Sequence, residues 1–359
     1  MDLDYLYSVA PYSLSAKDKH KVLTGILKEL TVKHYKNCPE YAKLLDVFDF
    51  NSDQISSYYD IPFLPVRLFK LFDLMSIKKE DVFKTMMSSG TTGGLASKIF
   101  LDKNTAASQQ KVLSKIISSY IGPKRLPMII VDTSAVLKNR KAFSARAAGI
   151  LGFSIFGTER IYALDENMQI DLKAINEFIE KYNGKKILIF GFTFMIWKHF
   201  LKEFMSANTY PDLSKGILFH GGGWKKLIND SVEPKVFKQS LQDHLGILEI
   251  HDYYGMVEQT GTVYVECEEG FLHAPVYSDI IIRRPADFSI ASFGETGLIE
   301  TVSVLPISYP GHALLTEDEG VIIGEDDCKC GRLGKYFKVL GRIQSAELRG
   351  CSDIYAETI

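Results

Sequence analysis

Four short apolar runs in the middle of the chain do most to limit what it can fold into. They occupy residues 127–132, 186–191, 216–221 and 246–251. Runs of this length, rich in Ile, Leu and Phe, are typical of buried strands. Helical patterns lie between them, and strands that alternate with helices form βαβ units around a parallel sheet. We therefore expect an α/β fold with mainly parallel sheets flanked by helices.

The sequence pattern changes on either side of these runs. Near the start, Ser15 and Asp18 form a helix-capping signature ahead of apolar residues at helical spacing. After residue 261 short strands and turns follow, including 278–283 and 298–304. The predicted parts are an α/β core over residues 1–260 with a helical cover over about 1–80, a β-rich subdomain over 261–340, and a hinge-like tail over 341–359.

Composition argues against several classes of function. The 359 residues are 46% hydrophobic and carry 42 basic against 44 acidic side chains, so no nucleic-acid partner is expected. No run reaches the ~20 apolar residues of a membrane span, and the N-terminus lacks a signal-peptide pattern, so we expect a cytoplasmic protein. Five cysteines are too few and too unevenly placed for a disulfide scaffold. The sequence leaves the oligomeric state open.

A segment of hydroxyl and glycine residues at 88–98 has almost nothing to bury. Its glycines let backbone N–H groups approach an anion, and its hydroxyls add side-chain donors. It is not a Walker A loop, because no lysine directly follows Gly93 or Gly94. A flexible linker is the alternative interpretation. The candidate phosphate-binding residues are Ser88, Ser89, Gly90, Thr91, Thr92 and Gly93.

Further polar and glycine-rich patches follow in order along the chain. They are the triple glycine Gly221, Gly222 and Gly223, the motif of Tyr254, Gly255 and Glu258, and the separate residues Asp318 and Arg342. The first two patches end predicted strands, where open parallel sheets bind their ligands. The alternatives are a simple turn for the glycines, a core aromatic for the tyrosine, solvated acidic turns for the carboxylates and a surface arginine.

Together with the hydroxyl and glycine segment, these patches resemble the adenylate-forming superfamily of acyl-CoA ligases and luciferases. The resemblance implies that residues 88–94 bind the phosphates of ATP, that Tyr254 lines the adenine pocket and that Glu258 holds Mg²⁺. It also implies a ribose contact for Asp318 and the start of a hinge at Arg342, which is in a position to pair with ribose or phosphate. A carboxylate that attacks ATP needs the opposing charges neutralised, which a phosphate loop and Mg²⁺ accomplish.

A closer similarity is to the acyl-protein synthetases of the bacterial luminescence fatty-acid reductase complex. The residues that carry it are 11–14, 144–149, 190–193 and 347–352, and the similarity covers essentially the whole chain. It implies that ATP activates a fatty acid as an acyl-adenylate. The acyl group then passes to an enzyme cysteine as a thioester, from which a partner acyl reductase takes it.

Cys351 is the candidate acyl acceptor. A thiol is a better nucleophile than a hydroxyl because part of it is already thiolate at neutral pH, and a thioester keeps the acyl group activated. The residue lies in a polar tail shortly after Arg342. A free surface thiol or a small buried residue is the alternative interpretation.

Three other cysteines suggest a metal site. Cys328 and Cys330 have the spacing of a compact metal knuckle, and Cys267 with His273 supplies a second pair in the same β-rich region. Four protein ligands leave no open position, so a Zn²⁺ ion here would be structural. Because Cys-x-Cys is less typical than Cys-x-x-Cys, ordinary reduced thiols are the alternative.

The chain also departs from the adenylate-forming pattern. The superfamily has a further C-terminal lobe of ~100 residues that delivers a catalytic lysine. Because this sequence ends at Ile359, we expect that large lobe and its lysine to be absent. Three functions remain open: an ATP-dependent acyl-protein synthetase, an acyl- or aryl-CoA ligase of the phenylacetate-CoA ligase type, and a non-catalytic scaffold subunit of an acyl reductase complex.

Overall fold

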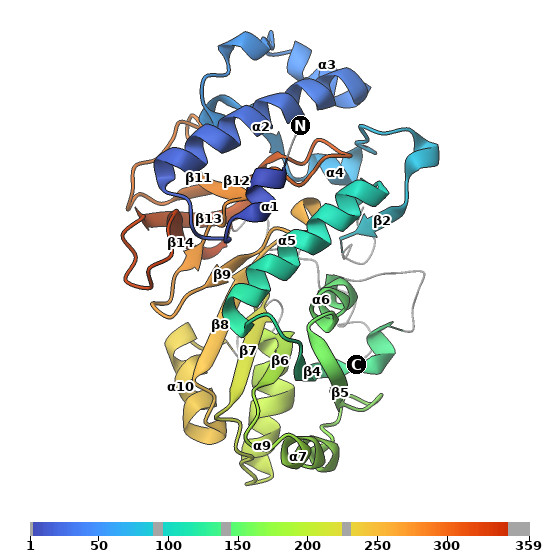
Figure 1. The fold of residues 1–359 in the computed structure, drawn as a ribbon, viewed down its shortest axis with the longest axis vertical. Coiled ribbons are helices and arrows are strands. Elements are labelled where there is room, and N and C mark those ends of the chain that lie inside the picture. Colours follow the sequence, from blue (N-terminus) through green and yellow to red (C-terminus); the bar gives the residue numbers. More distant parts are fainter. Residues whose placement is uncertain (1–2, 89–95, 138–144, 225–230, 344–359) are drawn as a thin grey trace. The chain divides into compact units, whose positions relative to one another are not determined.

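The computed structural model describes residues 3–88, 96–137, 145–224 and 231–343 (Figure 1). The chain forms two compact units. Unit 1 combines Met1–Ser119 with Tyr254–Ile359, and unit 2 is the continuous segment Tyr120–Tyr253. The division predicted from the sequence, with boundaries near residues 80, 260 and 340, stays a prediction.

Unit 2 is built on a parallel sheet. Its strands follow the order β8-β7-β6-β4-β5, and each neighbouring pair runs parallel. They are β4 (Leu126–Thr133), β5 (Gly157–Leu164), β6 (Ile187–Phe192), β7 (Gly216–Gly221) and β8 (Glu249–Tyr254). The helices of this unit are α6 (Ala145–Ser154), α7 (Leu172–Lys181), α8 (Thr193–Ile196), the π-helix η5 (Trp197–Leu201), α9 (Lys202–Ser206) and α10 (Pro234–Leu245). The predicted α/β fold with a mainly parallel sheet is confirmed.

Burial explains the apolar runs of this sheet. Every residue of β7 is buried, and the inner strands β4 and β6 contribute Ile129, Val131 and Ile189 to one hydrophobic cluster. Residues of α7 and α10, such as Ile175 and Leu241, belong to the same cluster. A strand that is covered on both faces has no reason to alternate apolar and polar residues.

Two details of this sheet differ from the sequence prediction. The fourth strand begins at Glu249 and not at residue 246, because Gly246 adopts a φ of 73° and ends α10. The edge strand β5 was not predicted, because half-buried Glu159 and exposed Arg160 interrupt its apolar pattern. An edge strand with one solvent-facing side lacks the continuous apolar signal of the inner strands.

Helices dominate the N-terminal part of unit 1. They are α1 (Asp4–Ser8), α2 (Ala16–Asn37), α3 (Pro39–Asp46), α4 (Leu68–Leu71) and α5 (Lys103–Ile121), with 3-10 turns η1 (Ser52–Gln54), η2 (Tyr58–Asp60) and η3 (Lys79–Asp81). The predicted amphipathic helix is confirmed: Ser15 caps α2 by accepting from the Asp18 N–H, and Leu23, Leu27 and Leu30 are buried. In the described ranges, no helix has both the length and the apolar character needed to cross a membrane.

The remainder of unit 1 is largely antiparallel sheet. The strand order is β11-β12-β13-β14-β10-β9, and β1 (Leu64–Pro65) pairs with β13 in parallel. The strands are β9 (Tyr264–Glu266), β10 (Leu272–His273), β11 (Ser278–Arg283), β12 (Gly297–Ser303), β13 (Ala313–Glu325) and β14 (Lys335–Arg342). Strands β11 and β12 correspond to the two predicted in this region.

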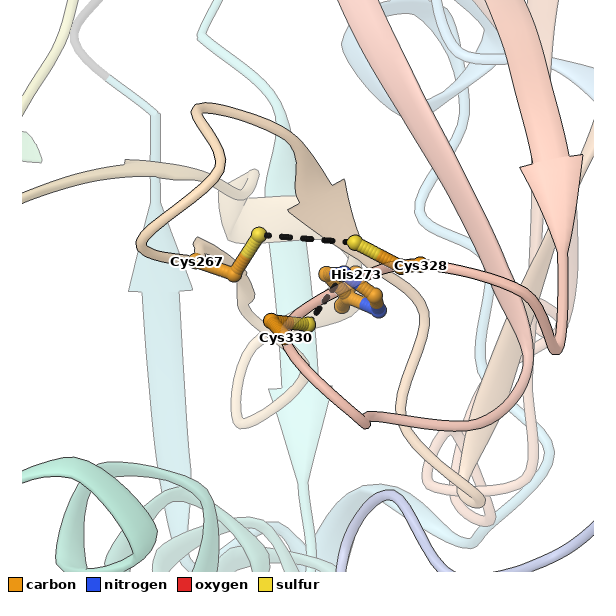
Figure 2. Close-up of side chains that lie close together, drawn as sticks. All are labelled: Cys267, His273, Cys328 and Cys330. Carbon is orange, nitrogen blue, oxygen red and sulfur yellow. Dashed lines mark hydrogen bonds between the residues drawn. The ribbon is translucent and has the colours of Figure 1, made fainter.

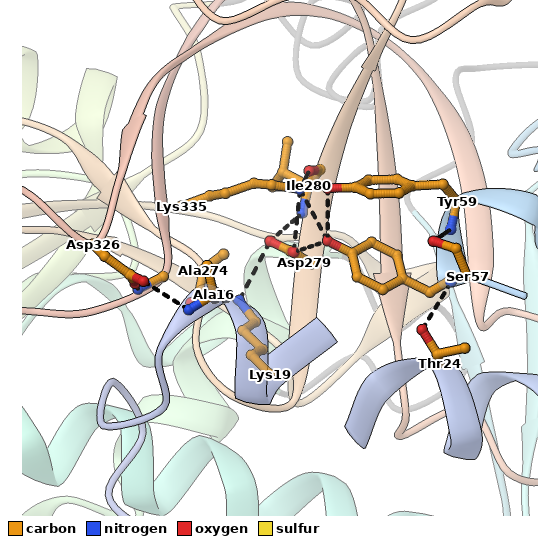
Figure 3. A network of polar contacts seen from close by, with 12 residues as sticks. Ala16, Lys19, Thr24, Ser57, Tyr59, Ala274, Asp279, Ile280, Asp326 and Lys335 are labelled. Carbon is orange, nitrogen blue, oxygen red and sulfur yellow. Dashed lines mark hydrogen bonds and ion pairs between the residues drawn. The ribbon is translucent and has the colours of Figure 1, made fainter. Parts of the chain in front are cut away.

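A buried charged network ties helix α2 to this sheet (Figure 3). The Asp279 carboxylate lies 3.3 Å from Lys19 Nζ and 3.2 Å from Lys335 Nζ, and it also accepts from the Tyr58 hydroxyl. Burial alone would raise the pKa of Asp279, but the two lysines outweigh it and lower this pKa to about 2. The three charged side chains are almost completely buried, so both lysines depend on the Asp279 carboxylate for counter-charge.

Candidate nucleotide and metal sites

The hydroxyl and glycine segment connects the strands of a hairpin, β2 (Lys84–Met87) and β3 (Lys98–Leu101). At its base the Ser97 N–H donates to Ser88 Oγ at 2.9 Å, and the Ser88 N–H donates to the Ser97 carbonyl at 3.1 Å. These reciprocal bonds fix both ends of the segment and leave the Ser88 side chain buried. The other predicted phosphate-binding residues, Ser89, Gly90, Thr91, Thr92 and Gly93, lie outside the described residues.

Three predicted nucleotide-binding residues meet in unit 1. The Tyr254 hydroxyl donates to Asp318 Oδ2 at 2.7 Å, and Arg342 Nε donates to Asp318 Oδ1 at 3.2 Å. Asp318 and Arg342 are cross-strand partners in β13 and β14, so their side chains emerge on the same face. The Asp318 side chain is 17% exposed. The result is a carboxylate held in one orientation with part of its surface open.

The surroundings of this group keep it in place. Thr316 Oγ1 accepts from the Asp318 N–H at 3.2 Å and donates to the Ile299 carbonyl at 2.8 Å. Burial, followed by the charge of Asp318, raises the pKa of Tyr254 well above its usual value, so the phenol stays a donor. The Tyr254 ring packs against Tyr264, with ring centroids 6.1 Å apart.

Glu258 lies in the 3-10 turn η7 (Val257–Gln259) and is buried. Burial raises the pKa of its carboxyl, although the Ser97 side chain and the charge of Lys70 act in the opposite direction. Gln259 anchors the turn, because its Nε2 donates to two backbone carbonyls at 3.1 and 2.9 Å. A buried carboxylate gains from a bound cation, so the position of Glu258 suits a Mg²⁺ ligand.

The remaining predicted residues lie in unit 2, at an exposed position of unit 1, or outside the described residues. Gly221, Gly222 and Gly223 belong to unit 2. An added Cβ at Gly221 would lie 2.7 Å from the Tyr253 ring, so packing of β7 against β8 already requires glycine there. Gly255 is an exposed residue of unit 1, and Cys351 lies outside the described residues. Their roles in nucleotide binding and acyl transfer stay predictions.

A second group in unit 1 brings together Cys267, His273, Cys328 and Cys330, whose ligand atoms all lie within 4.8 Å of one another (Figure 2). Cys267 follows β9, His273 ends β10, and the other two cysteines lie between β13 and β14. Burial raises the pKa of the Cys267 and Cys328 thiols and lowers the pKa of His273 to about 4. The imidazole is therefore neutral at physiological pH, the form that binds metals.

Sequence reasoning missed several supporting side chains. Ser97 and Thr316 flank the candidate residues but carry no motif of their own. In unit 2 the buried Asp132, near the carboxyl end of β4, accepts from Nε and Nη2 of Arg146 in α6. The position of Asp132 near the end of an apolar run was the one available signal for a polar site there.

The fold is that of adenylate-forming ligases. Two structures of 2-hydroxyisobutyryl-CoA ligase, both in complex with 2-HIB-AMP and CoA, match it with TM-scores of 0.72 and 0.71 at 15% sequence identity. Each match covers 93% of this chain, and the matches cover 77% and 70% of the ligase chains. At this identity the likeness establishes the fold.

The sequence model of the family described as acyl-protein synthetase, LuxE, matches residues 2–359, and the chain belongs to this family. The protein is therefore a ligase, and the family resemblance seen in its motifs is confirmed. A long-chain-fatty-acid–luciferin-component ligase of Aliivibrio fischeri is 25% identical over 369 residues, which cover 99% of this chain and 93% of the relative. The ligase of the same name from Vibrio harveyi is 22% identical, with 97% and 91% covered.

Proposed function

We propose that this chain uses ATP to activate a long-chain fatty acid as an acyl-adenylate and then receives the acyl group on its own Cys351. The observation that carries the activation step is the Asp318 carboxylate, held between Tyr254 and Arg342 in a chain of the acyl-protein synthetase family. The relatives in Aliivibrio fischeri and Vibrio harveyi are named as long-chain fatty acid ligases, which supports this class of substrate.

Each nucleotide residue has a separate task in this proposal. Asp318 accepts hydrogen bonds from the ribose hydroxyls, and its fixed orientation reduces the entropy lost on binding. Residues 88–94, which connect β2 and β3 in the sequence, would bind the phosphates through backbone N–H groups and hydroxyls. Glu258 would hold Mg²⁺, which supplies neutralising charge to the phosphates when it is bound.

The chemistry requires two displacements. A carboxylate oxygen of the fatty acid attacks the α-phosphorus of ATP, an oxygen–phosphorus bond forms, and pyrophosphate leaves. The Cys351 thiol then loses its proton, its sulfur attacks the acyl carbonyl, and AMP leaves with the electron pair of the broken carbon–oxygen bond. A partner acyl reductase takes the acyl group from this thioester. We place the reaction in the cytoplasm.

Coenzyme A is the alternative acceptor. The solved structures with the same fold include a CoA ligase bound to an acyl-adenylate and CoA, which favours this second function. In that case the thiol of CoA replaces Cys351 in the second displacement. The first displacement and the roles of the nucleotide-binding residues are the same in both functions. The final acceptor of the acyl group therefore distinguishes an acyl-protein synthetase from an acyl-CoA ligase.

The test uses the full-length protein with Mg-ATP and a panel of carboxylic acids. Exchange of labelled pyrophosphate into ATP is expected with long-chain acids, and no exchange with any acid would overturn activation and favour a scaffold. With labelled fatty acid, hydroxylamine-sensitive label is expected on the wild-type protein and on Cys38→Ala, whose cysteine is buried. Cys351→Ser is expected to keep the exchange and lose the label. Equal formation of acyl-CoA by Cys351→Ser would overturn the transfer step.

A further inference from the structure

The cluster of Cys267, His273, Cys328 and Cys330 has the separations of a tetrahedral metal site. Cys267 Sγ lies 3.9 Å from Cys328 Sγ, and Cys330 Sγ lies 3.3 Å from His273 Nε2. Zinc–sulfur bonds of about 2.3 Å and a zinc–nitrogen bond of about 2.0 Å at tetrahedral angles separate two sulfurs by about 3.8 Å and sulfur from nitrogen by about 3.5 Å. These two separations match such a site, and all four ligand atoms lie within 4.8 Å of one another.

A disulfide does not account for this group. A sulfur–sulfur bond measures about 2.05 Å, well short of the separation of Cys267 and Cys328. It would also use two of the three thiols and leave the imidazole without a role. His273 is fully buried beside Tyr336, with its ring directed at Cys330, and its Nδ1 has no hydrogen-bond partner in the described part of the chain.

Two backbone turns present the ligands. In the first, the Cys267 N–H donates to the Phe271 carbonyl at 2.8 Å, and the Gly270 N–H donates back to the Cys267 carbonyl at 3.0 Å. In the second, the Gly331 N–H donates to the Cys328 carbonyl at 3.0 Å, and Gly331 adopts a φ of 80° that favours glycine. Each turn has a defined shape of its own, which reduces the cost of ordering the ligands around an ion.

We propose that Cys267, His273, Cys328 and Cys330 bind one zinc ion. Three thiolates and one imidazole in tetrahedral geometry are the ligand set that Zn²⁺ prefers. The four side chains fill its coordination sphere and leave no position for a substrate, so the ion is structural. Binding releases the protons of the thiols, which couples metal affinity to pH.

The ion adds a crosslink between two segments that the Arg332–Glu268 ion pair also connects. The apolar cluster at this end of the sheet consists of Cys267, Cys328 and Tyr336, with Phe271 and Cys330 packed against it. Strand β10 pairs with β14 over two residues. Zinc therefore crosslinks the turn after β9 to the turn before β14, the strand that also contains Arg342.

The metal content of the full-length protein tests the proposal. Protein produced with zinc in the medium and purified without chelator is analysed by mass spectrometry for bound metal. Wild type and Cys38→Ala are expected to carry about one zinc per chain, and Cys330→Ser less than about a tenth as much. Wild-type protein without zinc overturns the site, as does equal zinc in Cys330→Ser.

A second measurement uses the wild-type chain alone, so it does not depend on how well the variant folds. Zinc is removed with a chelator under reducing conditions and replaced by Co²⁺. The expected absorption has strong d–d bands of a tetrahedral ion together with sulfur-to-metal charge transfer. The weak spectrum of an octahedral ion, or a Cys267–Cys328 disulfide in peptide maps of the purified protein, overturns the proposal. Neither measurement requires ATP or a fatty acid, so the result is independent of the proposed ligase reaction.

Discussion

The hydroxyl of Tyr254 lies 2.7 Å from Oδ2 of Asp318, which is 64 positions later in the sequence. Arg342 contacts the other oxygen of the same carboxylate from the neighbouring strand. Both oxygens are thus oriented by donors, and the group can present a fixed acceptor without rearranging. If these three residues bind ATP as proposed, they are expected to affect ATP binding in a coupled manner, because they share one carboxylate.

Removing either member of the Tyr254–Asp318 pair should weaken ATP binding. A hydrogen bond to a charged group contributes about 1.5–3 kcal/mol, so Tyr254→Phe and Asp318→Asn are each expected to raise the KM for ATP about tenfold or more. In the double variant the KM for ATP should rise by less than the product of the two single increases, because both substitutions break the same interaction. Kinetics of pyrophosphate exchange provide the measurement, with Glu159→Gln on an exposed ion pair as control. Multiplicative effects would contradict the coupling.

Glu258→Gln separates a role in catalysis from a role in folding. If Glu258 holds Mg²⁺ as proposed, its replacement is expected to reduce exchange by at least about a hundredfold. The melting temperature should stay the same or rise, because burial raises the pKa of Glu258 and the amide removes a charge that is costly to bury. Gln259→Ala is the matched contrast, since it removes two bonds to backbone carbonyls and should lower the melting temperature. A Glu258→Gln variant with full exchange activity would exclude the metal role.

Asp279→Asn should be strongly destabilising. It leaves Lys19 and Lys335 buried without their shared counter-charge, which costs about 3–5 kcal/mol. The pKa of Asp279 is lowered from 3.8 to about 2, so its contribution is present above pH 3.8 and is lost as the pH falls through 2. Urea unfolding at neutral pH checks the first statement, with exposed Asp287→Asn as control. A variant as stable as the control would show that the network is unimportant.

Buried histidines should make the protein sensitive to acid. Burial lowers the pKa of His220 in unit 2 and of His312 in unit 1 from 6.5 to about 3. Between these pH values the unfolded chain binds protons that the folded chain excludes, so stability falls as the pH decreases. At pH 5 each of these histidines should lower the free energy of unfolding by about 2 kcal/mol relative to its value at high pH. Between pH 8 and 5 the free energy of unfolding should depend less on pH for His220→Gln and His312→Gln than for wild type. The same pH dependence in the variants and the wild type would contradict the lowered pKa values.

Two glycine substitutions should have opposite signs. Gly261 has a φ of 90°, and an added Cβ would lie 2.6 Å from the backbone of Gln109, so Gly261→Ala should cost at least about 1–2 kcal/mol. Gly25 lies inside α2, and among the described residues nothing outside the neighbouring helix backbone lies within 4 Å of the added Cβ, so Gly25→Ala should stabilise by about 0.5–1 kcal/mol. Thermal unfolding of the two variants compares them directly. An equal change in melting temperature for the two variants would mean that the turn at Gly261 can rearrange to accept a side chain.

The sequence predicted those parts of the fold in which local pattern and burial agree. The inner strands of unit 2 are apolar throughout because both faces are covered, so β7 was predicted with its observed bounds. The start of β8 was misplaced because the apolar run continues through the C-cap at Gly246. Edge strand β5 was missed because one of its faces is exposed.

The candidate site shows the same limit at longer range. Cys267, His273, Cys328 and Cys330 could be grouped because their residue types imply one chemistry. The hydrogen bond between Tyr254 and Asp318 could not be predicted from the sequence, because it depends on the register of β13 against β14 and on where β8 ends. Ser97 lies in the hydroxyl and glycine segment and Thr316 lies close to Asp318, but the contacts of both side chains became evident in three dimensions alone.

The buried ion network also constrains the order of events during synthesis. Lys19 leaves the ribosome early, yet its counter-charge Asp279 lies 260 residues later, and Lys335, the second lysine paired with that carboxylate, lies later still. Unit 2 is continuous in sequence and is complete before Asp279 has been made. We therefore expect unit 2 to fold first during synthesis. The N-terminal part of unit 1 then completes its folding only after the C-terminal part of unit 1 has been synthesised.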